Sequence, residues 1–451
     1  MAMNVSSYRL PDDVFSALAA GGGGVRAVRH LAVAQYSKHV LLLRGVVDAA
    51  ETLGHPQAAH ARRAYDLLAT IQERAPGDVD AVIRHPAVGA WAWRTLRALH
   101  GEAAIAGAEP GRFAALAAAA AIRSRTPCTL DVPVTHGAIS FPSLGMATLP
   151  GRDSPAVLQC AADGAAVFTT GGRVDVPRDP SESGPGWRPL PRIVAEASEM
   201  TIRLLIDDLD PFRMPASANT APRLTAEDID WWRESLSEAW TLLVRYHPVA
   251  AEEIAATIRV LTPLTSPPNS QVGASSRETF GTVALSGPPD ARSIALTLCH
   301  EVQHAKLGAV IDIVALTRPD DGRRWYAPWR DDRRPIGGLL QGSYAFLGVS
   351  SFWHRQRWHE DGAAALTAHS EFFRWRAAAQ LAVASLLSGG QLTPTGEQFV
   401  AGMARTLRGW EGEPVPPEAR MIAQQDAEQH LASWRLRNGD SATPSEREHG
   451  G

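Results

Sequence analysis

Two histidines stand four residues apart in the run His300-Glu301-Val302-Gln303-His304. Residues four apart on an α-helix lie about 40° from each other and one turn apart, so both imidazoles can bind one metal ion at about 2.0–2.1 Å. Glu301 projects about 100° from His300, where zinc peptidases carry the base that activates metal-bound water. The spacing predicts a metal-dependent enzyme. The alternative is a pair of histidines that bond only to backbone or water.

A metal site of this kind needs a third ligand. The longer metzincin motif is absent, because Gly308 stands one place late and position 310 is Val310. Asp312 lies about 80° around the helix from His304, two turns away, which favours an ion-pair partner or a group that supports a ligand. No spacing selects among the other downstream candidates, which are Gln341, Tyr344, His354, Glu360, His369 and Glu371.

A charged loop with interleaved aromatic residues runs from Tyr326 to Pro335. Arginine side chains clamp carboxylates with two parallel hydrogen bonds, so Arg330, Arg333 and Arg334 could hold an acidic cosubstrate near the metal. The residues alone favour a solvated loop instead, in which these arginines pair with its aspartates, Asp331 and Asp332.

The elements that must position these residues are mostly helices. Residues 1–125 and 286–438 show helical spacing of apolar residues, and the motif follows the apolar residues Ile294 and Leu298, as on a buried helix. Residues 126–285 mix short β-branched strands with a helix from Thr225 to Tyr246. Residues 439–451 are polar and predict a disordered tail. We expect a mainly α fold with a smaller β component (α+β), a helical shell around a modest central sheet.

Composition excludes several classes of protein. The net charge of −4 gives no reason to expect nucleic acid or an anionic membrane as a partner. Three scattered cysteines argue against a disulfide framework and for a reducing compartment. The first residues do not resemble a signal peptide, and no apolar run is long enough to span a membrane. We therefore expect a cytoplasmic protein.

Four stretches of the chain together resemble the HExxH-motif peptide-modification family. They are His300 to Ala309, Tyr326 to Arg330, Gly338 to Leu347 and, near the N-terminus, Leu31 to Leu43 with Gln35, Ser37, Lys38 and His39. The three C-terminal stretches together are far more specific than the histidine motif alone. Members of this family accompany ribosomally made, post-translationally modified peptides, either as free enzymes or fused behind radical-SAM maturases.

The resemblance implies an Fe(II)- and 2-oxoglutarate-dependent dioxygenase that hydroxylates the β-carbon of a residue in a precursor peptide. His300 and His304 would bind Fe(II) and leave positions open for 2-oxoglutarate and O₂. Gln341 is the expected third ligand or a group in contact with one, and Glu301 would orient a ligand or bound water.

The same resemblance changes the interpretation of the charged loop. It favours Arg330 or Arg334 as the partner of the 2-oxoglutarate carboxylate, with Tyr344 as a further cosubstrate-binding residue.

Two other hypotheses stay open at this point. A zinc metallopeptidase would use Zn(II) on the same histidines with Glu301 as its general base. A peptide-binding or scaffold protein would retain the motif without catalysis. In each case we expect the peptide in a groove between the N-terminal part and the metal-bearing part, bordered by the irregular loop from Thr265 to Arg277.

Overall fold

The helices of this computed structural model carry the metal motif and most of the core. The structure describes residues 8–102, 105, 107–149, 156–265, 273–287 and 290–439. The α-helices are α1 Asp12–Ala19, α2 Gly24–Thr52, α3 Ala58–Arg74, α4 Pro76–Ile83, α5 Pro86–Leu99, α6 Phe113–Ser124, α7 Ala226–Tyr246, α8 Pro248–Thr257, α9 Ala291–Ile313, α10 Ile336–Gln356, α11 Gly362–Ser388, α12 Pro394–Gly409 and α13 Pro417–Asn438. A short 3₁₀ turn, Pro110–Arg112, precedes α6.

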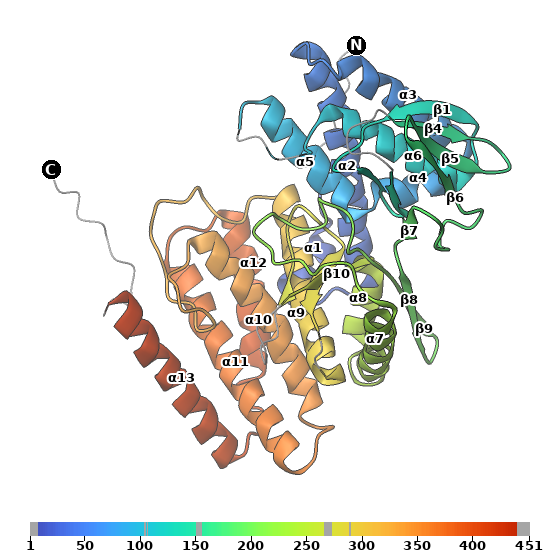
Figure 1. Cartoon of the computed structure of the whole chain (residues 1–451). Helices are drawn as coiled ribbons and strands as arrows, with labels where there is room; N and C mark the ends of the chain where they lie inside the picture. The colour runs from blue at the N-terminus through green and yellow to red at the C-terminus, as the bar shows by residue number, and fades with distance from the viewer. Residues whose placement is uncertain are drawn as a thin grey trace.

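Among the described residues, the strands are short and form three separate sheets. They are β1 Cys128–Val132, β2 Ala138–Phe141, β3 Gly145–Thr148, β4 Ala156–Cys160, β5 Ala165–Thr169, β6 Gly172–Val176, β7 Trp187–Pro189, β8 Arg192–Ala197, β9 Met200–Ile206, β10 Val260–Leu264, β11 Gly273–Ala274 and β12 Thr282–Ser286. The strand orders are β1-β4-β5-β6, β2-β3-β7 and β11-β12-β10-β9-β8. The predicted α+β class with a large helical majority is confirmed, but its β component is three sheets rather than one central sheet (Figure 1).

The N-terminal lobe consists of α3–α6 with the strands β1–β7 (Figure 1). Both of its sheets are antiparallel. Helix α6 is buried from Phe113 to Ile122, and its run of alanines lets neighbouring elements approach closely. Trp91 and Phe113 meet edge to face in the same core.

The C-terminal lobe consists of α7–α13 with α1 and the strands β8–β12. Strand β10 runs parallel to both β9 and β12, and β10 and β12 are buried along their whole length. Helix α7 begins with a capping box between Thr225 and Asp228. Helix α2 packs against α5 in one lobe and against α8 and α9 in the other, so it joins the two.

Helix α9 carries the histidine motif and packs closely against α10. Asp290 caps its first turn by accepting a hydrogen bond from the Ser293 amide at 3.0 Å. At Gly348 of α10, a Cβ would lie 2.5 Å from Cγ of Gln303 on α9, so only glycine allows this approach. The motif therefore lies on a buried helix, as predicted.

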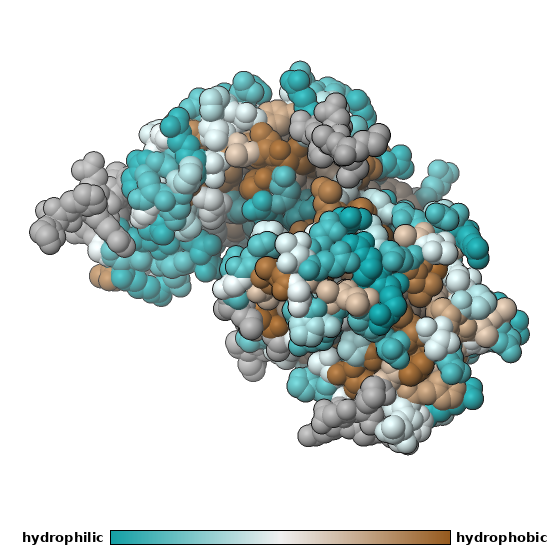
Figure 2. All heavy atoms as spheres, turned by 90° about the horizontal axis from the view of Figure 1, so that it is seen from above, coloured by the Kyte–Doolittle hydropathy of each residue, from teal (hydrophilic) through white to brown (hydrophobic). Residues whose placement is uncertain are grey.

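The surface shows no membrane-spanning element among the described residues, because none of their helices is both long and apolar enough to cross a bilayer. Figure 2 shows hydrophobic residues in patches among hydrophilic ones on one face, which is hollowed between its two halves. The predicted tail beyond Gly439 and part of the loop from Thr265 to Arg277 lie outside the described residues.

Candidate metal centre

His300 and His304 point their Nε2 atoms at each other from one face of α9. The two Nε2 atoms are 3.1 Å apart. Two nitrogen ligands at right angles on a metal with bonds of about 2.1 Å would be about 3.0 Å apart. Both histidines are half-buried, so one side of the pair stays accessible. This spacing of the Nε2 atoms would allow the two rings to share one ion.

Gln341 on α10 fixes the orientation of His304. Its Oε1 lies 3.2 Å from Nδ1 of His304, the ring nitrogen remote from His300. With Nδ1–H donating to that oxygen, Nε2 of His304 carries the lone pair that a metal requires. Burial, with a smaller contribution from His304, lowers the pKa of His300 to about 3. His300 is therefore neutral at pH 7, the state in which imidazole binds metals.

Glu301 lies beside the histidine pair in a buried environment. It is 2% exposed, and its Oε1 is 3.9 Å from Nε2 of His300. Strand β11 passes close to it, because a Cβ on Gly273 would lie 3.1 Å from Oε1. Burial raises the pKa of Glu301. Its Oε2 has no hydrogen-bond partner among the described residues, so a bound water or ligand would satisfy it.

The donor set fits two positions of a metal site. Within the described ranges, no group of three or more His, Cys, Asp or Glu residues surrounds a common point. The carboxylate ligand usual in iron oxygenases is therefore not found there, and Gln341 as third ligand stays a prediction. Its observed contact with Nδ1 of His304 supports a positioning role.

Asp312 is an ion-pair partner, as its place on the helix predicts. Its Oδ2 accepts from Lys38 at 2.7 Å and from Gln35 at 2.8 Å, and its Oδ1 accepts from Nε of Arg277 at 2.6 Å. Lys38 and Gln35 belong to the N-terminal stretch that carries part of the family resemblance. In the structure, their hydrogen bonds to Asp312 connect α2 to α9.

The other downstream candidates are engaged elsewhere or lie on other helices. His354 pairs with Glu413 at 3.2 Å, and Glu360 accepts from Gln356 at 2.8 Å. Glu371 accepts a hydrogen bond from the Trp375 indole on the same helix. None of the three belongs to a metal-binding cluster among the described residues.

Tyr344 is fully buried in the core between α10, α1 and α12. Its hydroxyl donates to the carbonyl of Leu18 at 2.6 Å, and its ring packs against Phe399. A cosubstrate-binding role for this hydroxyl, expected from the sequence, does not fit this position. The sequence predicts the helix that carries Tyr344, but which of its faces is buried depends on its packing against α9 and α11.

Arg330 and Arg334 both pair with Asp332, at 2.9 and 3.1 Å. The local ion pairs that the sequence allows are thus present in the loop. Arg334 lies against Gly338, one turn of α10 before Gln341. Pairs this exposed are worth about 0–1 kcal/mol, so a carboxylate ligand could replace Asp332 at small cost.

An aromatic wall made of Phe346, Trp329 and Trp375 borders His300. Phe346 meets the His300 ring edge to face at 5.4 Å, and Trp329 stacks on Phe346 at 4.6 Å. Trp375 of α11 reaches Phe346 from another direction at 4.5 Å. The sequence shows these aromatic residues but not that they meet, because they come from a loop and two different helices.

A buried ion pair behind the motif is the main feature that sequence reasoning missed. Lys306, fully buried on α9, donates to Glu253 of α8 at 2.7 Å. Lys306 and Gln303 also donate to the carbonyl of Gly21, at 3.1 and 2.8 Å. Lys306 within an otherwise apolar stretch of α9 could have indicated this ion pair, because a buried lysine needs a partner.

Comparisons of the chain with protein-family models and with curated protein sequences find no match.

Proposed function

We propose that this chain is an Fe(II)- and 2-oxoglutarate-dependent oxygenase that hydroxylates the β-carbon of a residue in a ribosomally made precursor peptide. The observation that carries the proposal is the convergence of two Nε2 atoms at 3.1 Å, with the outer nitrogen of His304 held by Gln341. Non-haem iron oxygenases bind iron through two histidines and one carboxylate and leave positions open, and the histidine pair matches the two imidazoles of that set. The substrate class comes from the family resemblance.

Iron bound here would supply the activation of O₂. The residues of the chain supply its surroundings. His300 and His304 hold the ion, and Gln341 keeps His304 in the ligating tautomer. Glu301 places a carboxyl group where it can accept a hydrogen bond from a bound water. Phe346 covers His300 and excludes water from that side.

The cosubstrate and the peptide would approach from the accessible side of the histidine pair. We assign the carboxylate of 2-oxoglutarate to Arg330 or Arg334, which would exchange Asp332 for it. The wall of Phe346, Trp329 and Trp375 offers the apolar contact surface for a peptide side chain. We place the reaction in the cytoplasm, in keeping with three cysteines that are all free.

The test is reconstitution without oxygen, using Fe(II), 2-oxoglutarate and a candidate precursor peptide, followed by air. We expect the peptide to gain the mass of one oxygen atom and succinate to form in equal amount. Omission of 2-oxoglutarate should abolish both. If neither the peptide mass nor succinate changes in the complete mixture, the proposal is wrong.

A zinc peptidase is the second candidate, because the Glu301 carboxyl lies 3.9 Å from Nε2 of His300. That hypothesis requires cleavage of the peptide by the zinc-loaded protein without 2-oxoglutarate. It also requires Glu301→Gln to abolish cleavage while the metal stays bound. Retention of hydroxylation with no cleavage would exclude it.

A further inference from the structure

A cavity of about 410 Å³ lies between the β8–β9 hairpin and the N-terminal lobe. Five of its lining residues are arginines, and no acidic residue lines it: Arg84, Arg123, Arg192, Arg203 and Arg259. None of the lining residues belongs to α9 or α10. The cavity is therefore separate from the histidine pair.

Strand register explains why two of these arginines, Arg192 and Arg203, line the cavity together. In the β8–β9 pair, Arg192 faces Leu205 and Val194 faces Arg203, so both arginines lie on one face of the hairpin. The alternate residues, such as Ile193, are buried in the core on the other face. Arg259 directly precedes β10, the parallel neighbour of β9.

Positive charge in this cavity is only partly balanced. Arg84 lies 3.6 Å from Asp80, and Arg123 lies 3.6 Å from Asp78. Within the described part of the chain, the three arginines of the strand wall (192, 203 and 259) have no carboxylate within 4.0 Å. All three are exposed to solvent. Desolvation and repulsion by Arg84 lower the pKa of Arg259, and attraction by Asp80 opposes that decrease.

Buried donors without partners line the same cavity. Ser143 is 5% exposed and His85 is 3% exposed. Among the described residues, the hydroxyl of Ser143, both ring nitrogens of His85 and Nε of Arg123 have no hydrogen-bond partner. Ser143 holds a left-handed backbone with φ of 69°, which is uncommon for a residue other than glycine.

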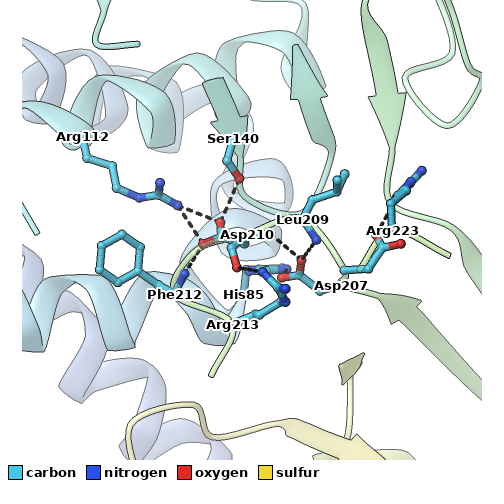
Figure 3. Close-up of polar contacts among 10 residues, drawn as sticks. His85, Arg112, Ser140, Asp207, Leu209, Asp210, Phe212, Arg213 and Arg223 are labelled. Carbon is cyan, nitrogen blue, oxygen red and sulfur yellow. Dashed lines mark hydrogen bonds and ion pairs between the residues drawn. The ribbon is translucent and has the colours of Figure 1, made fainter. Parts of the chain in front are cut away.

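His85 has an acidic neighbour behind the cavity wall. Its Nε2 lies 3.7 Å from Oδ2 of Asp207, which is too long for a hydrogen bond. Figure 3 shows His85 beside Asp207 and Asp210, with Arg112 bound to the Asp210 carboxylate. His85 therefore lies between Asp207 on one side and the cavity on the other.

We propose that this cavity binds a small anion that carries two or more negative charges on phosphoryl or carboxylate groups. Guanidinium groups match both by paired hydrogen bonds, and the volume falls in the range of small-molecule sites. The hydrophobic residues Val194, Leu205 and Val260 line the rest of the cavity and suit the carbon skeleton of an organic anion. Bound ligand would relieve the repulsion among the arginines and occupy the free donors of Ser143 and His85.

The test uses the purified full chain at physiological salt, with inorganic pyrophosphate and citrate as phosphoryl and carboxylate probes. We expect saturable calorimetric binding of at least one probe and a rise in melting temperature. The tighter probe identifies the chemistry of the natural ligand. Binding should persist in His300→Ala, which separates this site from the metal centre. Absence of binding by both probes would overturn the proposal.

Variants separate a binding role from a structural one. Arg203→Gln with Arg259→Gln should weaken probe binding at least tenfold without lowering the melting temperature of the free protein, because like charges are removed. Arg405→Gln, an exposed change on α12, is the matched control and should bind normally. If the double variant does not fold, Arg192→Gln on the edge strand β8 replaces it and should also weaken probe binding. Unchanged affinity, or a lower melting temperature of the free variant, would contradict the assignment.

Discussion

At the scale of single residues, the two nitrogens of His304 have different partners. Nε2 faces His300, and Nδ1 faces the amide oxygen of Gln341. A hydrogen bond on the outer nitrogen fixes the ring and its tautomer, and such partners commonly raise metal affinity 10–100-fold.

Gln341→Leu tests this positioning role. We expect metal affinity to fall by about 10–100-fold, measured by competition with a chelator, while His304→Ala loses high-affinity binding altogether. Gln398→Leu, an exposed change on α12, should have no effect. A Gln341→Leu variant that loses metal as completely as His304→Ala would instead make Gln341 a ligand, as the sequence predicts.

Spacing was sufficient to predict the histidine pair, because residues four apart on a helix share a face whatever surrounds them. The family resemblance, by contrast, did not predict the surroundings of the Tyr344 hydroxyl. That hydroxyl meets Leu18, a residue 326 positions away in the chain, and no local pattern encodes such a contact. Likewise, the burial of Glu301, with no hydrogen-bond partner for its Oε2 among the described residues, depends on how closely β11 approaches α9.

At the scale of elements, α10 is shaped to receive the loop that carries Trp329. A Cβ on Gly342 would overlap the Trp329 indole, so the absence of a side chain there lets the ring lie against the helix. Gly337 on the same helix has no atom within 4 Å of its Cβ position. The two glycines therefore make a matched pair.

Gly342→Ala should displace Trp329 from Phe346 and lower the free energy of unfolding by about 1–3 kcal/mol. Gly337→Ala should leave stability unchanged or raise it by up to about 1 kcal/mol. Urea unfolding and tryptophan emission of the folded state measure both effects. Equal behaviour of the two variants would show that the indole does not pack at Gly342.

The helices of the chain could be located from apolar periodicity, whereas the sheets could not be assembled. Strands β8 and β9 follow each other in the chain and pair directly. Strand β10, however, pairs with β9 only after α7 and α8 intervene. Non-local pairing of this kind has no local signature, which is why one sheet was expected where three exist.

At the scale of the whole molecule, two polar clusters tie the lobes together. Asp312 of α9 binds Lys38 and Gln35 of α2. On the other side, Asp210 follows β9 and binds Arg112, and also Ser140 of β2 at 3.1 Å (Figure 3). Both clusters are built around carboxylates, so the connection between the lobes should weaken in acid.

The pH dependence of the Asp312 cluster follows from its pKa. Burial opposes ionisation, but Lys38, Gln35 and Arg277 outweigh it, and the pKa of Asp312 is lowered. A lowered pKa stabilises the fold above the unfolded value of about 3.9 and loses this effect as pH falls through the folded value.

Asp312→Asn should therefore lower the free energy of unfolding by about 2 kcal/mol at pH 7. The difference from the unmodified protein should shrink as pH falls below about 4. Urea titrations between pH 7 and pH 3 measure it. A difference that stays constant over this range would mean that the charge of Asp312 is not what binds α2.

The central claim is that His300 and His304 together hold one metal ion, and anaerobic Fe(II) titration followed by metal analysis tests it most directly. We expect one equivalent of iron to be bound by the unmodified chain and none to be held tightly by His300→Ala or His304→Ala. His354→Ala, which removes a histidine paired with Glu413, should still bind one equivalent. Equal iron content in all four proteins would contradict the account.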